Sequence, residues 1–74
     1  MAERKQKMNT FENLTRQNNI YPAIGTNEDG ETVIIERGHN ENGDYVRVET
    51  AQANGWIRIN YYYENGDAEE MFVG

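Results

Sequence analysis

Four Asx-Gly pairs divide the last two thirds of this chain into short segments that are rich in Val, Ile and Tyr. Such a pair is the strongest short-range signal for a hairpin turn, because both of its residues tolerate a positive φ angle. Successive glycines stand 13, 12 and 11 residues apart, which leaves room for one strand and one turn but none for a helical crossover. The sequence therefore predicts an antiparallel β-meander. Its turns are expected at Asp29-Gly30, Asn42-Gly43, Asn54-Gly55 and Asn65-Gly66.

Five strands fit around these turns, and we place them at 20–25, 32–37, 45–50, 56–64 and 68–73. Pro22 cannot donate a ladder hydrogen bond, so the first strand should lie at an edge or be broken by a bulge. We expect the sheet either to remain open or to curl into a small barrel.

The strand register depends on the length of each turn. A two-residue turn at Asn42-Gly43 would pair Glu36 with Glu49, whereas a longer loop would pair Arg37 with Glu49; the sequence leaves both registers open. In the last hairpin, a two-residue turn predicts Tyr63 opposite Ala68. The expected core face of that hairpin then holds Ile57, Ile59, Tyr61, Tyr63, Ala68 and Phe72, and the second face holds Trp56, Arg58, Asn60, Tyr62, Glu69, Met71 and Val73.

The N-terminal segment has a different period. Met8, Phe11 and Leu14 recur every three residues, which predicts a short amphipathic helix at about 8–17 that packs on the sheet; a strand at 10–14 is the alternative. Residues 1–7 are polar and basic and should be a flexible extension. We therefore expect one α+β domain over 8–74, mainly β in content.

Charge is distributed unevenly along the chain. Residues 17–74 contain three arginines and eleven carboxylates, a balance of −8, whereas residues 1–16 carry +2. A field of this sign repels nucleic acid and attracts basic proteins; solubility is the alternative role for these carboxylates. The carboxylates that we expect to face a partner are Glu28, Asp29, Glu31, Glu41, Asp44, Glu69 and Glu70.

Residue types that carry catalysis are scarce. The chain has no serine and no cysteine, and His39 is the only imidazole, so it has neither of the usual acyl-transfer nucleophiles and no ligand set for zinc. The two Asx-rich turns lack the full spacing of a calcium loop. We expect a non-enzymatic protein without metal or cofactor.

An aromatic run at 56–63 is the remaining candidate for recognition. Strand alternation places Trp56, Arg58 and Tyr62 on the second face, away from the helix. Arginine between aromatic rings can stack unpaired bases, and the same residues also anchor protein interfaces. The acidic surroundings favour a protein partner over nucleic acid.

In size, charge and compactness the chain resembles the accessory proteins of phages and mobile elements, including anti-CRISPR and anti-restriction inhibitors. That resemblance implies a small inhibitor that occludes the nucleic-acid-binding surface of a basic partner. The alternatives are a single-stranded nucleic-acid binder and a structural protein that forms a homodimer through an edge strand. No apolar run reaches the ~18 residues of a membrane span, and residues 1–7 lack the apolar part of a signal peptide, so we expect a cytoplasmic protein.

Overall fold

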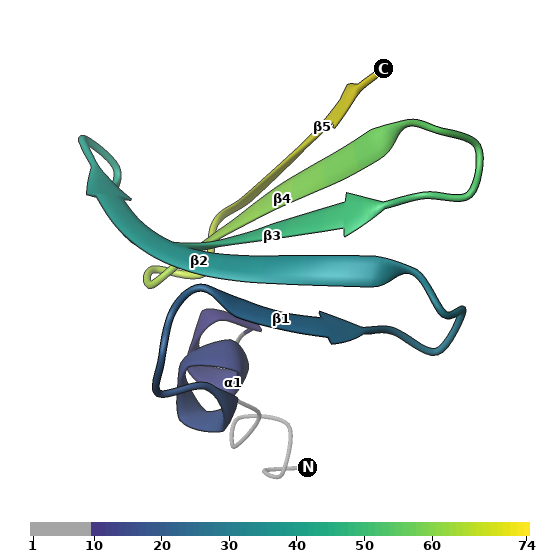
Figure 1. Ribbon diagram of the computed structural model, residues 1–74. Helices are drawn as coiled ribbons and strands as arrows, with labels where there is room; N and C mark the ends of the chain where they lie inside the picture. Colours follow the sequence, from purple (N-terminus) through teal and green to yellow (C-terminus); the bar gives the residue numbers. More distant parts are fainter. Residues whose placement is uncertain (1–9) are drawn as a thin grey trace, which may run out of the picture.

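In the computed structural model, which describes residues 10–74, one short helix precedes a five-stranded antiparallel sheet (Figure 1). Strand order is β1-β2-β3-β4-β5, so each strand pairs with its neighbours in sequence, and β1 and β5 form the two edges of an open sheet. The predicted helix and meander are confirmed, whereas residues 1–7 and Met8 lie outside the described part. The elements are α1 Thr10–Gln17, β1 Ala23–Thr26, β2 Thr32–Asn40, β3 Gly43–Ala51, β4 Ile57–Tyr63 and β5 Ala68–Val73. Within residues 10–74, no helix is long and apolar enough to cross a membrane.

All four Asx-Gly pairs lie at hairpin turns, but the last of these turns is not of the predicted two-residue kind. At the β4–β5 turn, the Gly66 amide donates to the Tyr63 carbonyl at 2.9 Å, and the Tyr63 amide donates to the Asp67 carbonyl at 2.9 Å. Gly66 has φ of 99°, and no residue other than glycine has a positive φ in residues 10–74. This geometry is a type I turn followed by a left-handed glycine. The asparagine acts through its side chain instead, since Asn65 Oδ1 accepts a hydrogen bond from the Asp67 amide at 2.9 Å.

The longer β4–β5 turn changes the register of these two strands. Tyr62, rather than Tyr63, lies opposite Ala68, so the predicted pairing of this hairpin was wrong by one residue. At the β2–β3 hairpin neither predicted register occurs. Asn40 pairs with Gly43 there, which places Glu36 opposite Arg47. Opposite charges therefore meet across these two strands, where the predicted two-residue turn would have paired like charges.

Helix α1 identifies the covered face of the sheet. Arg37, Val46 and Tyr62 are successive cross-strand partners, so their side chains share one face. The Arg37 guanidinium carbon lies 5.1 Å from the centre of the Phe11 ring of α1, and Val46 beneath it is fully buried. We call this side the helix face and the other side the open face.

The helix therefore covers the face opposite to the predicted one, because Arg58 and Tyr62 lie on the helix face and not on an exposed second face. The helix packs on this face because β2 and β3 contribute aliphatic residues to it. The prediction considered only the last hairpin and did not include them. These residues are Val33, Ile35, Val46 and Val48.

The open face is nevertheless partly buried. Ile59 and Tyr63, which were predicted as core, are only 7% and 3% exposed although α1 packs on the other side. Figure 1 shows that β2 curves strongly toward its C-terminal end. Neighbouring side chains on this face therefore cover one another, and the tyrosines of β3 and β4 form a second small core.

Candidate partner-binding surfaces

Three tyrosines form the centre of the open face. The ring of Tyr45 meets those of Tyr61 and Tyr63 edge-on, at centroid distances of 5.0 and 5.9 Å. Such edge-to-face contacts stabilise a cluster beyond the area it buries. Tyr45 also lies over Gly38, its partner on β2. These rings therefore pack mainly on one another, with Tyr63 buried and the other two half-buried.

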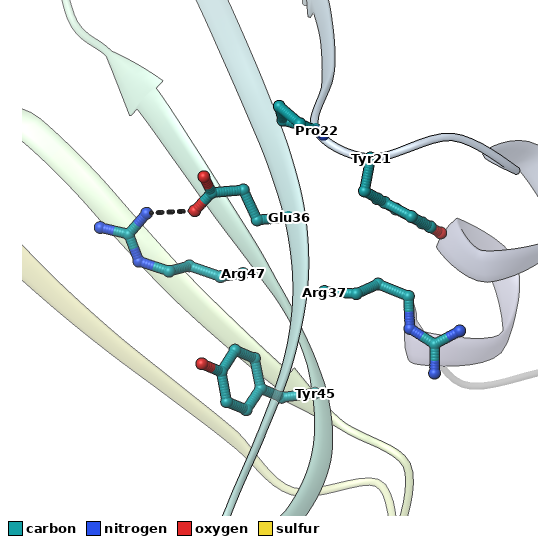
Figure 2. A pocket seen from close by; sticks show the side chains of 6 residues that line it. All are labelled: Tyr21, Pro22, Glu36, Arg37, Tyr45 and Arg47. Carbon is teal, nitrogen blue, oxygen red and sulfur yellow. Dashed lines mark hydrogen bonds and ion pairs between the residues drawn. The ribbon is translucent and has the colours of Figure 1, made fainter.

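Arg47 lies beside this cluster and is neutralised within the sheet. Its guanidinium Nη1 donates to Glu36 Oε1 at 3.1 Å (Figure 2). The same nitrogen donates to Glu49 Oε1 at 3.2 Å. Burial alone would lower the pKa of Arg47, but a hydrogen bond to Tyr61 and the charge of Glu49 outweigh it and leave the pKa raised. Arg47 is therefore a structural cation and is not available for an external anion.

A pocket of about 300 Å³ adjoins this ion pair. Figure 2 shows that Arg37 points toward the helix, away from Arg47 and Glu36, so the two arginines do not converge on one point. The pocket thus lacks the concentrated charge of an anion-binding site. It is lined by Tyr21, Pro22, Glu36, Arg37, Tyr45 and Arg47.

Carboxylates gather at one end of the sheet, where the β2–β3 and β4–β5 turns lie side by side. The Glu64 amide donates to the Asp44 carbonyl at 3.1 Å and joins the two turns. Tyr63 Oη donates to Glu69 Oε1 at 3.2 Å and attaches β5 to the same end. Segments 40–44 and 64–70 contain no lysine or arginine. We call this region the acidic end; its carboxylates are Glu41, Asp44, Glu64, Asp67, Glu69 and Glu70.

The predicted acidic surface is thereby divided. Glu28, Asp29 and Glu31 belong to the β1–β2 turn, which lies at the opposite end of the sheet (Figure 1). There Asn27 Oδ1 accepts hydrogen bonds from the amides of Asp29 and Glu31, both at 3.0 Å, and fixes the turn. Glu64 and Asp67, in contrast, were not predicted as partner-facing. Their position at a turn was a usable signal, but only the adjacency of two turns places them with Glu41 and Asp44.

His39 lies on β2 and not in the turn itself. Its Nδ1 is 2.6 Å from Asp44 Oδ1, and its side chain is largely exposed. This cross-strand pair lies at the acidic end. Among residues 10–74, no group of three or more His, Cys, Asp or Glu side chains is arranged to hold a metal ion.

The aromatic and arginine residues predicted as one surface are separated. Arg58 and Tyr62 are half-buried on the helix face, and Arg58 Nε is buried without a hydrogen-bond partner. Trp56 precedes β4 and is half-exposed. Its ring lies against Gly74, where an added Cβ would be 2.6 Å from Trp56 Cδ2. Trp56 therefore borders the end of β5 rather than an open surface around Arg58.

Strand β5 is an exposed edge, of which Glu69 and Glu70 but not the apolar residues were predicted to face a partner. Every residue of β5 is exposed. Three of these are large apolar residues, Met71, Phe72 and Val73, with exposures of 44%, 52% and 49%. Together with Trp56 they form an apolar margin that continues from the acidic end along one side of the sheet.

Comparison with protein families, with curated proteins and with solved structures found no match to this chain. The candidate surfaces are therefore assigned on geometry and chemistry alone.

Proposed function

We propose that this protein is a non-catalytic binding module whose acidic end docks on a basic surface of a protein partner. The observation that carries the proposal is the junction of the β2–β3 and β4–β5 turns, which places carboxylates of both hairpins together. Residues 10–74 hold four arginines and twelve carboxylates, a balance of −8. Arg47 is neutralised by its own glutamates, so the field of the acidic end has little internal opposition.

A nucleic-acid-binding surface is the partner class that this charge fits best. Lysine and arginine side chains that bind phosphate also bind carboxylate, and an acidic module seated on them would exclude the nucleic acid. We therefore propose inhibition by occlusion, the mode of the anti-CRISPR and anti-restriction proteins that the chain resembles. The charge would act chiefly on association, because a complementary field raises the encounter rate.

Affinity capture from source-cell lysate tests this proposal. We compare the wild-type protein with a pair of substitutions at the acidic end, Glu41→Gln with Asp67→Asn. The matched control removes the same charge from the opposite end, Glu28→Gln with Asp29→Asn. All four side chains are exposed.

A partner captured at 50 mM salt should be lost at 500 mM, because exposed charges are screened beyond ~4 Å at high ionic strength. It should be captured less well by the acidic-end variant than by the control variant. With the purified partner, the acidic-end variant should associate more slowly while its dissociation rate changes little. Capture that is independent of salt, or equal loss in both variants, would contradict docking through the acidic end.

A further inference from the structure

The outer edge of β5 has backbone groups that no strand within residues 10–74 satisfies. Tyr63 and Asp67 form a hydrogen-bonded pair at the β4–β5 turn, and such pairs alternate along an antiparallel ladder. In the observed register the next hydrogen-bonded residues of β5 are Glu69, Met71 and Val73. The amide and carbonyl groups of Ala68, Glu70 and Phe72 must then point away from β4.

The other edge is a weaker template for strand addition. Strand β1 has only four residues, and Pro22 precedes it. Proline removes a donor from a free edge and discourages pairing. Strand β5 is two residues longer and has no proline, so it is the edge suited to accept another strand.

The side chains of β5 divide into two chemical halves. Glu69 and Glu70 lie next to the acidic end, and Met71, Phe72 and Val73 follow with about half of each side chain exposed. A strand that runs antiparallel to β5 would therefore meet three apolar residues and then two carboxylates. The complementary sequence has apolar residues followed by two basic residues.

We propose that β5 accepts an extended apolar-then-basic segment of the partner as a sixth, antiparallel strand of the sheet. The proposal rests on the proposed function, since it specifies how a basic partner is held once charge has brought it to the acidic end. Backbone hydrogen bonds to Ala68, Glu70 and Phe72 would supply affinity. The apolar and acidic halves would set direction and register, as in other cases of strand addition.

A second copy of this chain fits the same edge less well. In an antiparallel pair of two β5 strands centred on Met71, Glu69 and Glu70 of each copy would lie opposite Val73 and Phe72 of the other, and the strand contains no cation to neutralise them. Each copy also carries a net charge of −8 over residues 10–74, so two copies repel one another. A basic segment neutralises Glu69 and Glu70 directly, which favours a partner over self-association.

A synthetic peptide, acetyl-Thr-Val-Ile-Val-Lys-Lys-Thr-amide, serves as the probe. In the proposed register its isoleucine lies opposite Phe72, and its first lysine lies opposite Glu70. N-methylation of these two residues removes amide hydrogens that face β5. The matched control peptide is methylated at the second valine and the second lysine, whose amides face solvent.

The unmodified peptide should bind and shift the backbone NMR signals of Ala68–Val73. The inward-methylated peptide should bind at least about tenfold more weakly, because it loses two backbone hydrogen bonds to β5. The control should retain most of its affinity. In the protein, Glu70→Gln should weaken binding more than Glu28→Gln.

Three results would overturn the strand proposal: no binding at millimolar peptide, equal affinities of the two methylated peptides, or a dimer of the free protein held through β5 in sedimentation. None of these depends on the lysate experiment. Loss of peptide binding with intact salt-dependent capture would reject the strand and keep the acidic-end proposal. Peptide binding without salt-dependent capture would keep the strand proposal and reject docking through the acidic end.

Discussion

Replacement of Gly38 by alanine should destabilise the protein by disturbing the tyrosine cluster. Gly38 lies on β2 opposite Tyr45, whose ring covers it. A Cβ at position 38 would be 2.5 Å from Tyr45 Cζ and 2.8 Å from Cε1, closer than carbon atoms approach without strain. The ring cannot move freely, because it is held edge-on by Tyr61 at 5.0 Å and Tyr63 at 5.9 Å.

The expected cost follows from overpacking. Insertion of a methyl group into a packed cluster typically costs ~1–3 kcal/mol, whereas a domain of this length has a total stability of about 4–11 kcal/mol. A loss of ~1 kcal/mol lowers the melting temperature of such a small domain by roughly 4–8 °C. The substitution should therefore be visible in a thermal melt and should not abolish folding.

Gly25→Ala is the matched control, since Gly25 also lies in a strand and an added Cβ there meets no atom within 4 Å. Circular dichroism melts and urea unfolding should show that this control is neutral or slightly stabilising. Removal of the ring should also relieve the clash, so Gly38→Ala should cost far less in a Tyr45→Ala background. Additive costs in that double-mutant cycle, or an unchanged melting temperature for Gly38→Ala, would refute the packing explanation.

Two further predictions concern the turn and the helix. Gly66→Ala should lower the free energy of unfolding in urea by about 1 kcal/mol, because the new Cβ meets no neighbour and only the φ of 99° penalises it. Gly66→Asn should lower it less. Equal stability of the wild-type protein and both variants would place the strain elsewhere. Phe11→Ala should cost roughly 3–5 kcal/mol, because Phe11 is 6% exposed and is the residue that α1 buries. Phe11→Leu should cost clearly less than Phe11→Ala, and a neutral Phe11→Ala would mean that the helix is not held by packing.

The sequence by itself determined the elements of this fold. Turn chemistry at the Asx-Gly pairs, the spacing of apolar residues near Phe11 and the β-branched runs between turns are all local signals, and each predicted its element. The number of strands, their order and the presence of one helix follow from them. Pro22 likewise predicted an edge position for the first strand, which β1 occupies.

Only the tertiary structure decided which residues meet. A type I turn with a left-handed Gly66 is one residue longer than the predicted turn, and that residue shifts every pair of the β4–β5 ladder by one position. Side chains alternate with a period of two, so a slip of this size exchanges the two faces of a strand. The face on which α1 packs is also set by non-local contacts, because it depends on the valines that β2 and β3 contribute to that face.

The candidate surfaces divide in the same way. An excess of carboxylates could be read from composition, and the individual turn residues could be named. Their separation into two ends of the sheet could not, because it depends on which turns the meander places side by side. Asp44 and Glu64 are 20 positions apart in the chain, yet a 3.1 Å backbone hydrogen bond joins their turns. Contacts of that kind arise from strand pairing across the whole sheet, which no local pattern encodes.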